Sequence, residues 1–342
     1  MKPGGRTVEV IGAIRAAAEV KGKAMTSAIT ATGLRKSFGG TVVLDGIDLE
    51  VAAGTTFSLL GPNGAGKTTT VQIMSTLVHA DGGEARVAGH NVARDPAAVR
   101  AAIGVTGQFS AVDTLLTGQE NLLLMADLHH LGRAERQRRA AALLDKFDLA
   151  EAAAKTVATY SGGMKRRLDL AMTLIGDPRI IFLDEPTAGL DPRSRRMMWQ
   201  TIRELVAGGV TIFLTTQQLD EADELADRIA VLDHGKIVAA GTPDELKRSI
   251  PGAHVRLRFT GAAGLESAAR AIGGAFRHDD TLTLEVPSDG GAVAVRDLLN
   301  RLGDAAAGVD EVSVHTPDLD DVFFALTGHP TAETTPEMEN VR

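Results

Sequence analysis

Short apolar runs alternate with segments of helical periodicity along most of the chain. Residues 55–60, 180–183 and 210–215 are apolar runs typical of strands that are buried on both faces. The segments expected to be helices lie between and after them, at residues 67–77, 161–175, 193–207 and 220–226. Strands that alternate with helices predict an α/β fold around a largely parallel sheet.

Other segments extend this pattern in both directions. Residues 28–34 and 44–51 are expected to be short strands, residues 99–150 mostly helical, and residues 229–233 a further strand. A break follows at Ile250, Pro251 and Gly252. Beyond the break, we expect strands at residues 254–259, 281–286 and 311–315 and helices at residues 265–272, 293–302 and 319–326. This β-α-β-α-β order predicts a small α+β second domain.

These patterns give the expected domain boundaries. Residues 1–25 form an N-terminal extension that we expect to be disordered, and Met25 is an alternative start. Residues 26–250 form the main domain and residues 251–328 the second domain. Residues 329–342 are rich in Pro, Thr and Glu, a composition typical of disordered tails.

Composition narrows the function classes. Of the 342 residues, 44% are hydrophobic, which excludes wholesale disorder. The formal net charge of −8 argues against a nucleic-acid partner, since nucleic-acid-binding domains are normally basic. The chain has no cysteine, which excludes disulfides, thiolate metal sites and cysteine nucleophiles. No stretch approaches the ~18 consecutive apolar residues of a membrane-spanning helix.

A glycine-rich loop follows the strand at residues 55–60 and precedes a predicted helix. It matches the P-loop pattern in the residues Gly61, Pro62, Asn63, Gly64, Ala65, Gly66, Lys67 and Thr68. We expect the next residue, Thr69, to contact the nucleotide as well. The glycines let backbone N–H groups point at phosphates, and the helix N-terminus adds partial positive charge. We expect Lys67 to bridge the β- and γ-phosphates of ATP and Thr68 to hold Mg²⁺. The alternative is a glycine-rich turn matched by chance.

Two carboxylates follow the apolar strand at residues 180–183. Open α/β sheets bind ligands at the carboxyl ends of their strands, where Asp184 and Glu185 would lie. We expect Asp184 to reach Mg²⁺ and Glu185 to orient and deprotonate the attacking water. The alternative is that both acids only cap the turn before Pro186.

Further motifs give the chain a resemblance to the ATPase subunits of ABC transporters. The segment at residues 160–164, with Ser161, Gly162 and Gly163, resembles the ABC signature motif. Residues 184–192, including Asp191, resemble the Walker B and D-loop run. Gln108 resembles the Q-loop glutamine, and Phe38 the aromatic residue that stacks on adenine. These motifs occur in the ABC order across residues 28–246.

The resemblance implies a complete assembly around the site. It implies a P-loop NTPase of ABC type, with a parallel-sheet core, an antiparallel β subdomain and a helical subdomain. Its substrate and cofactor would be ATP and Mg²⁺, with Thr68, Gln108 and Asp184 as the metal ligands. Each signature motif would contact the γ-phosphate bound by the other subunit of a head-to-tail dimer. A separate integral membrane permease would recruit the dimer to the cytoplasmic face of the cell membrane.

One position departs from the family pattern. Gln217 stands where most ABC ATPases carry a histidine, and glutamine can donate a hydrogen bond but cannot titrate. This leaves Glu185 as the expected base, with Gln217 as a second catalytic residue. Together with the segments at residues 215–223 and 319–323, Gln217 is similar to the daunorubicin/doxorubicin-resistance exporter ATPases.

That subfamily implies export of a drug-like or lipophilic compound, and hence a role in antibiotic resistance. Exporters of lipids, glycoconjugates or ions would share the same ATPase, so those cargoes remain alternatives. A soluble ABC ATPase that acts on DNA or the ribosome is a more remote alternative, since the zinc-binding cysteines common in that group are absent.

Overall fold

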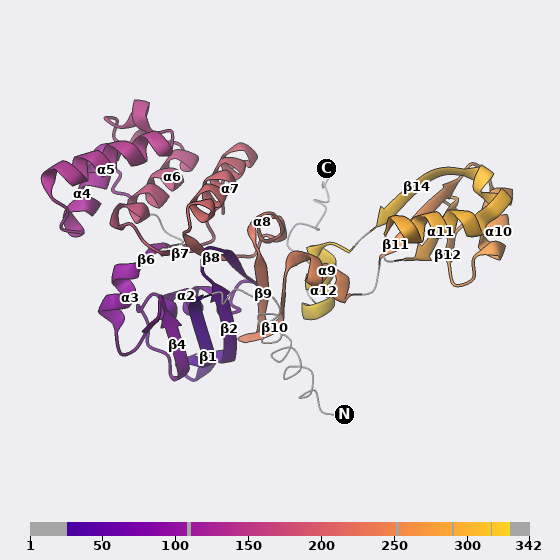
Figure 1. Ribbon diagram of the computed structural model, residues 1–342, viewed down its shortest axis with the longest axis horizontal. Helices are drawn as coiled ribbons and strands as arrows, with labels where there is room; N and C mark the ends of the chain where they lie inside the picture. The colour runs from indigo at the N-terminus through magenta and orange to yellow at the C-terminus, as the bar shows by residue number, and fades with distance from the viewer. Residues whose placement is uncertain (1–25, 108–110, 251–252, 289–290, 316, 329–342) are drawn as a thin grey trace, which may run out of the picture. The chain divides into compact units, whose positions relative to one another are not determined.

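The computed structural model describes residues 26–107, 111–250, 253–288, 291–315 and 317–328 (Figure 1). The expected N-terminal extension and C-terminal tail both lie outside these residues. The chain divides into two compact units, Met1–Pro243 and Asp244–Arg342. Within the described part of the chain, no helix combines the length and apolarity that crossing a membrane requires.

The first unit is built around a six-stranded sheet in the order β10-β9-β3-β8-β7-β6. Its strands are β3 (Thr56–Leu60), β6 (Ile103–Thr106), β7 (Ile180–Asp184), β8 (Thr211–Thr216), β9 (Arg228–Asp233) and β10 (Lys236–Gly241). All neighbours pair in parallel except β10, which runs antiparallel to β9. This arrangement confirms the predicted parallel sheet.

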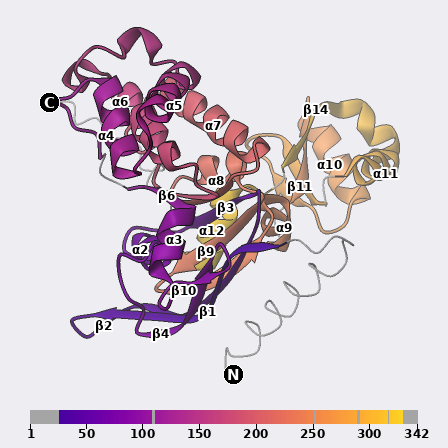
Figure 2. The ribbon, with the colours of Figure 1, turned by 60° about the vertical axis from the view of Figure 1, so that its left-hand side comes forward.

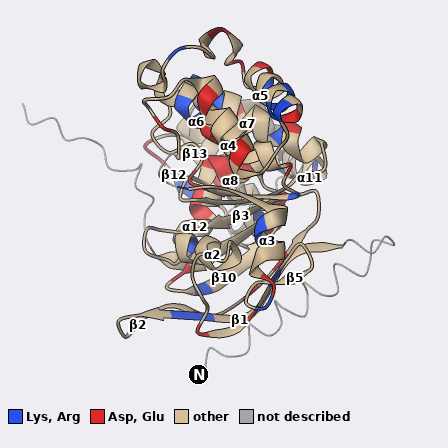
Figure 3. Ribbon diagram, turned by 90° about the vertical axis from the view of Figure 1, so that its left-hand side faces the viewer, with Lys and Arg blue, Asp and Glu red and all other residues tan. Residues whose placement is uncertain are grey.

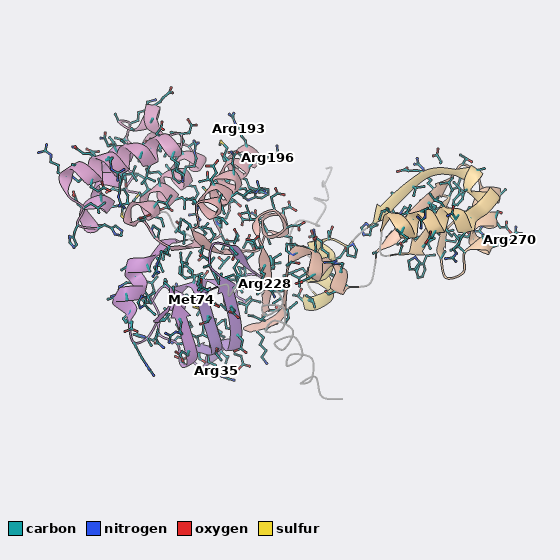
Figure 4. The ribbon with its side chains drawn as sticks, in the orientation of Figure 1. Arg35, Met74, Arg193, Arg196, Arg228 and Arg270 are labelled. Atoms are coloured by element: carbon teal, nitrogen blue, oxygen red, sulfur yellow. The ribbon has the colours of Figure 1, made fainter. Side chains whose placement is uncertain are left out.

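The central strands are buried on both faces, as their continuous apolar runs require. On β7, Ile180 and Phe182 join one hydrophobic core, whereas Ile181 and Leu183 join another on the opposite face. The first core also contains residues of α2 (Lys67–Met74), including the fully buried Met74 labelled in Figure 4. Figure 3 shows helices on both sides of the sheet, with α2 on the side opposite α4–α7.

An antiparallel sheet in the order β2-β1-β4-β5 shares the first core. Its strands are β1 (Ser27–Phe38), β2 (Thr41–Ala52), β4 (Gly82–Val87) and β5 (His90–Asn91), and α3 (Pro96–Ala102) follows them. On its exposed side, Arg35 of β1, labelled in Figure 4, pairs with Asp45 of β2 at 2.7 Å. The pairing of β1 with β2 and β4 is the antiparallel β subdomain that the resemblance implies.

The second core lies under a layer of helices (Figure 2). These are α4 (Gly118–Leu128), α5 (Arg133–Lys146), α6 (Gly162–Thr173), α7 (Pro192–Ala207) and α8 (Leu219–Leu225). The expectation that residues 99–150 are mostly helical was wrong directly after α3. Residues 103–106 form β6, because Ile103 and Val105 continue the parallel sheet beside β7.

The second unit begins at α9 (Pro243–Ser249), and a small α+β domain follows. Its elements are β11 (His254–Phe259), α10 (Ala262–Ala271), β12 (Phe276–His278), β13 (Thr283–Pro287), α11 (Ala292–Leu302), β14 (Val309–His315) and α12 (Leu319–Thr327). The four strands form an antiparallel sheet in the order β12-β13-β11-β14. The predicted β-α-β-α-β order lacked β12. This short strand is exposed along its whole length, so it has no apolar alternation to reveal it.

Several elements gave no sequence signal. The unpredicted strands β5 and β10 lie at sheet edges, where polar residues are tolerated on both faces. Strand β4 lies inside its sheet but begins with Gly82, Gly83 and Glu84, which show no apolar alternation. The remaining turns of helix are of the 3₁₀ type: η1 (Ala150–Ala152), η2 (Val157–Thr159), η3 (Leu174–Gly176) and η4 (Gly303–Gly308).

Tyr160 fixes the start of α4 against the segment that leads to α6. Its buried hydroxyl donates a hydrogen bond to the carbonyl of Ala152 at 2.7 Å. Gly118, the first residue of α4, packs so closely that a Cβ atom there would lie 2.3 Å from this hydroxyl oxygen. Any side chain at Gly118 must therefore displace Tyr160.

We predict that Gly118→Ala destabilises the protein by about 1–3 kcal/mol, the usual cost of overpacking a core. Thermal unfolding should show a melting temperature lower by about 2–4 °C for each kcal/mol. Gly162→Ala is the matched control, because Gly162 is also the first residue of its helix but a Cβ atom there meets no heavy atom within 4 Å. Equal melting temperatures for the two variants would contradict the packing argument.

Candidate functional site

The predicted site residues gather where neighbouring parallel strands end. The P-loop follows β3, Asp184 ends β7 with Glu185 directly after it, and Gln217 follows β8. Backbone hydrogen bonds join these ends: Gly61 N–H donates to the Thr216 carbonyl at 3.3 Å. Glu185 N–H likewise donates to the Thr215 carbonyl at 3.0 Å. Three strands adjacent in the sheet thus deliver the predicted motifs to one edge, the usual ligand-binding edge of such sheets.

The P-loop can be built only with glycines at particular positions. Gly64 and Gly66 adopt φ angles of 80° and 110°, in the region that favours glycine. A Cβ atom at Gly66 would lie 2.9 Å from the Val43 carbonyl oxygen, and one at Gly61 would lie 2.2 Å from that of Leu232. The loop is therefore pressed against β2 and β9, and its path into α2 is set by backbone contacts.

The first turn of α2 presents its N–H groups toward the loop. Gly66 is the N-cap of this helix and has no side chain to accept from them. Within the loop, Pro62 is half-buried, Asn63 is exposed and Ala65 is buried. Thr69 is half-buried on the same first turn. Uncapped N–H groups at a helix start form a site suited to an anion.

Lys67 places a buried cation inside the loop. Its ammonium group donates to the carbonyls of Gly61 at 2.7 Å and Pro62 at 3.1 Å. It lies 3.9 Å from Oε1 of Glu185. Burial lowers the pKa of Lys67, and the carboxylates of Glu185 and Asp184 oppose that shift. The positive charge of the P-loop and the negative charge at the end of β7 therefore face each other directly.

Asp184 connects three elements through its two carboxylate oxygens. Oδ2 accepts a hydrogen bond from the Thr68 hydroxyl at 3.0 Å, and Oδ1 accepts one from the Thr215 hydroxyl. The carboxylate is buried, so these bonds offset the cost of removing its charge from water. The adjacent oxygens of Thr68 and Asp184 are hard ligands of the kind that Mg²⁺ prefers. Gln108, the third predicted ligand, lies outside the described residues.

Glu185 has an unusual backbone conformation. Its φ angle is 49°, in the left-handed region that residues other than glycine seldom adopt. Its side chain is 13% exposed and lies beside Lys67 at the mouth of the site. Strained residues of this kind cluster at functional sites and persist only where their surroundings hold them in place.

Gln217 and Phe38 are both exposed. Gln217 directly follows the last residue of β8, at the same edge of the sheet as Glu185. Phe38 ends β1, and its ring lies 5.0 Å from the ammonium group of Lys36. The ring is 46% exposed, so Phe38 is not an ordinary core residue. Because Ser37 pairs with Val42, the hairpin end that carries Phe38 adjoins the segment packed on Gly66.

The signature residues begin α6. Ser161 is its N-cap, and the Ser161 hydroxyl accepts from Met164 N–H at 3.2 Å. Gly162 faces open space, whereas a Cβ atom at Gly163 would lie 2.5 Å from the hydroxyl oxygen of Ser194. That hydroxyl donates to Asp191 at 2.6 Å, and Asp191 also caps α7 by accepting from two N–H groups of its first turn. The carboxylate of Asp191 therefore holds the D-loop against the signature glycines.

The sequence interpretation missed a buried network behind this edge. The carboxylate of Glu221 on α8 accepts from the Thr187 hydroxyl at 2.8 Å and from the Trp199 indole at 3.3 Å. Burial raises the pKa of Glu221, and hydrogen bonds from Thr216, Thr187 and Trp199 oppose the shift. The only available signal was the single tryptophan of the chain, on the face of a helix. Thr215 and Arg166 were also missed.

Comparison with known proteins gives a consistent result. The family model described as ABC transporter matches residues 44–188. The chain is 47% identical over 312 residues to the daunorubicin resistance ATP-binding protein DrrA2 of Streptomyces coeruleorubidus, covering 90% of this chain and 97% of that one. It is 46% identical over 317 residues to the daunorubicin/doxorubicin resistance ATP-binding protein DrrA of Streptomyces peucetius, covering 91% and 96%.

A solved structure extends the likeness to the fold. It is a dimeric ATP-binding cassette in a post-hydrolysis state, bound to ADP and Pi, with a TM-score of 0.58 and 25% identity. The match covers 63% of this chain and 98% of the cassette. It confirms the predicted fold class, in which a parallel core, an antiparallel β sheet and a helical layer surround the P-loop. By its motifs, fold and relatives, the chain belongs to the ATP-binding proteins of ABC transporters, in the family of the daunorubicin and doxorubicin resistance ATP-binding proteins.

Proposed function

We propose that this protein is the Mg²⁺-dependent ATPase subunit of an exporter for a drug-like or lipophilic compound. Two copies bind ATP in a head-to-tail dimer on the cytoplasmic face of the cell membrane, where a separate integral membrane permease carries the cargo. One observation carries the proposal: Lys67, Thr68, Asp184 and Glu185 converge at one edge of the parallel sheet. A buried cation, a hydroxyl and two carboxylates are the groups that phosphoryl transfer from ATP requires.

In the binding step, each part of the P-loop has a separate task. Backbone N–H groups of the P-loop and of the first turn of α2 surround the phosphates, and Lys67 neutralises charge on the β- and γ-phosphates. Thr68 and Asp184, with Gln108, would hold Mg²⁺, which would supply electrostatic stabilisation of the phosphate oxygens. The exposed ring of Phe38 stacks on the adenine.

In the hydrolysis step, Glu185 accepts a proton from the attacking water. Its position beside Lys67 keeps the carboxylate next to the phosphate that is being transferred. Gln217, at the end of the neighbouring strand, donates a hydrogen bond to the γ-phosphate or its product. The groups are held in place before the reaction, so little reorganisation is needed as charge develops.

The signature residues act on the partner's ATP. Ser161 and Gly162 stand exposed at the start of α6, where N–H groups and the helix dipole favour an anion. The dimeric cassette bound to ADP and Pi, which has a similar fold, supports a dimer as the working unit. Asp191 supports this surface by bonding to Ser194 behind Gly163.

The proposed cargo rests on the relatives named for daunorubicin and doxorubicin resistance. Lipid, glycoconjugate and ion export remain alternatives, since no ATPase residue described above would touch the cargo. A soluble ATPase acting on DNA or the ribosome is disfavoured by the net charge of −8.

We predict that Glu185→Gln keeps ATP binding but lowers kcat by about 10²–10⁴-fold, because the attacking water loses its base. The variant should accumulate as an ATP-bound dimer, visible by size-exclusion chromatography. Glu204→Gln is the matched control: it makes the same change at an exposed carboxylate on α7 and should hydrolyse ATP normally. Near-native hydrolysis by Glu185→Gln would remove Glu185 as the base.

The export proposal is tested with the same variant. Cells that produce the protein together with its co-purifying membrane subunit should expel a fluorescent anthracycline, and cells with Glu185→Gln should not. If ATP hydrolysis depends on Glu185 but anthracycline efflux is the same with and without the pair, the cargo assignment is wrong and the ATPase assignment stands.

For Gln217 we predict that the side chain must donate a hydrogen bond but need not titrate. Gln217→His should retain substantial activity, whereas Gln217→Ala should lose roughly 1.5–3 kcal/mol of transition-state stabilisation, the worth of a hydrogen bond to a charged group. Gln217→Glu should be slower still, since it adds repulsion beside the phosphate. Steady-state ATP hydrolysis measures all three, with Gln200→Ala on α7 as an exposed control.

A purely structural role for Gln217 makes the opposite prediction. If Gln217 only packs at the end of β8 and Glu185 performs the chemistry alone, the His, Ala and Glu variants will hydrolyse ATP at similar rates. That outcome would end the catalytic assignment of Gln217.

A further inference from the structure

Arg166 lies on the second turn of α6, and every hydrogen-bond donor of its side chain is used. Its guanidinium has five N–H donors, and each has an acceptor. Nε donates to the carbonyl of Pro186 at 2.9 Å. One terminal nitrogen donates to the carbonyl of Gly107 at 2.9 Å and to a carboxylate oxygen of Asp169 at 3.4 Å. The other donates to the carbonyls of Asp184 and Glu185, each at 3.1 Å.

These carbonyls belong to the segments that carry out the proposed chemistry. Asp184, Glu185 and Pro186 are consecutive, so one planar side chain holds three successive peptide groups where β7 ends. Gly107 follows β6 and directly precedes Gln108. Arg166 is therefore the point at which the signature helix, the catalytic strand end and the Q-loop segment are joined.

The surroundings of Arg166 keep it fixed. Its side chain is only 12% exposed, and that of Asp169, one turn further along α6, is 4% exposed. Asp169 also accepts from the N–H of Ala111 at 3.2 Å, which ties α6 to the chain beyond the Q-loop. Burial lowers the pKa of Arg166, opposed by the carboxylates of Asp169, Glu221 and Asp184. An arginine in this setting remains charged and strongly hydrogen-bonded.

The strained backbone of Glu185 gives these bonds a consequence. A non-glycine residue at φ 49° is retained only where several contacts hold it. Glu185 has such contacts on both sides: its N–H donates to Thr215, and its carbonyl accepts from Arg166. Since the peptide geometry sets the direction of the side chain, loss of the Arg166 bonds would let the Glu185 carboxylate move.

We infer that Arg166 is a positioning residue for ATP hydrolysis. It holds the signature helix α6 in place relative to the backbone that orients the Glu185 side chain. The inference rests on the proposed role of Glu185 as the base. It adds a physical link within one subunit between the helix that faces the partner's ATP and the carboxylate that acts on the subunit's own ATP. Arginine is required because lysine has no planar fork with which to bridge several carbonyls.

The test is a double-mutant cycle with Arg166→Lys and Glu185→Gln, measured as single-turnover ATP hydrolysis. Arg166→Lys alone should lower the rate on the order of ten- to hundredfold, the effect of misplacing a catalytic group. The KM for ATP should stay within about threefold of the native value, since the P-loop is untouched. In the Glu185→Gln background, Arg166→Lys should change the rate by less than about threefold, because its effect acts through Glu185.

Arg139→Lys is the matched control. Arg139 of α5 is also partly buried and also bridges a carboxylate and a backbone carbonyl, those of Glu135 and Ile175, but neither partner belongs to the segments that form the site. It should leave the hydrolysis rate and KM unchanged. Thermal unfolding of each variant separates a shift of Glu185 from a loss of folded protein.

Three outcomes would overturn the inference. The first is an equal rate loss from Arg166→Lys in both backgrounds. The second is a raised KM with an unchanged rate. The third is a native rate for Arg166→Lys. If instead Glu185→Gln itself hydrolyses ATP at the native rate, the proposed function fails first, and the two failures are thereby distinguished.

Discussion

The candidate site depends on the two hydrogen bonds that the Asp184 carboxylate accepts. Thr68 donates from the helix that follows the P-loop, and Thr215 donates from the neighbouring strand β8. A carboxylate buried to this extent is stable as an anion only if both oxygens have partners. The same two bonds fix the P-loop helix relative to the catalytic strand end, so the stability of the core and the geometry of the site share one cause.

Backbone strain at Glu185 is the second element of this arrangement. A left-handed φ angle costs free energy on the order of 1–3 kcal/mol at a non-glycine residue. The surrounding structure supplies the compensation through β8 on one side and the Arg166 guanidinium on the other. Glu185, the proposed base, is therefore held by the neighbouring strand β8 and, through Arg166, by α6.

The sequence predicted what depends on local pattern, and missed what depends on distant contacts. The P-loop was recognisable because Gly61, Gly64 and Gly66 are required by steric limits that any such loop shares. The ends of β7 and β8 were predictable because these strands are apolar on both faces. Arg166 carried no signal, because four of its five acceptors are backbone carbonyls from two other segments. Strands such as β4 and β10 were missed because they have few buried positions, namely Ala85 and Val87 of β4 and Gly241 of β10.

The central claim is that the edge formed by β3, β7 and β8 binds one ATP, which the signature helix of a second copy completes. A crystal structure of Glu185→Gln with ATP and Mg²⁺ tests this most directly. It should show phosphate oxygens bonded to Lys67, the metal about 2.0–2.1 Å from ligand oxygens that include Thr68, and the γ-phosphate contacted by Ser161 of the partner subunit. A nucleotide bound away from this edge, or a γ-phosphate contacted by Ser161 of the same chain, would contradict the account.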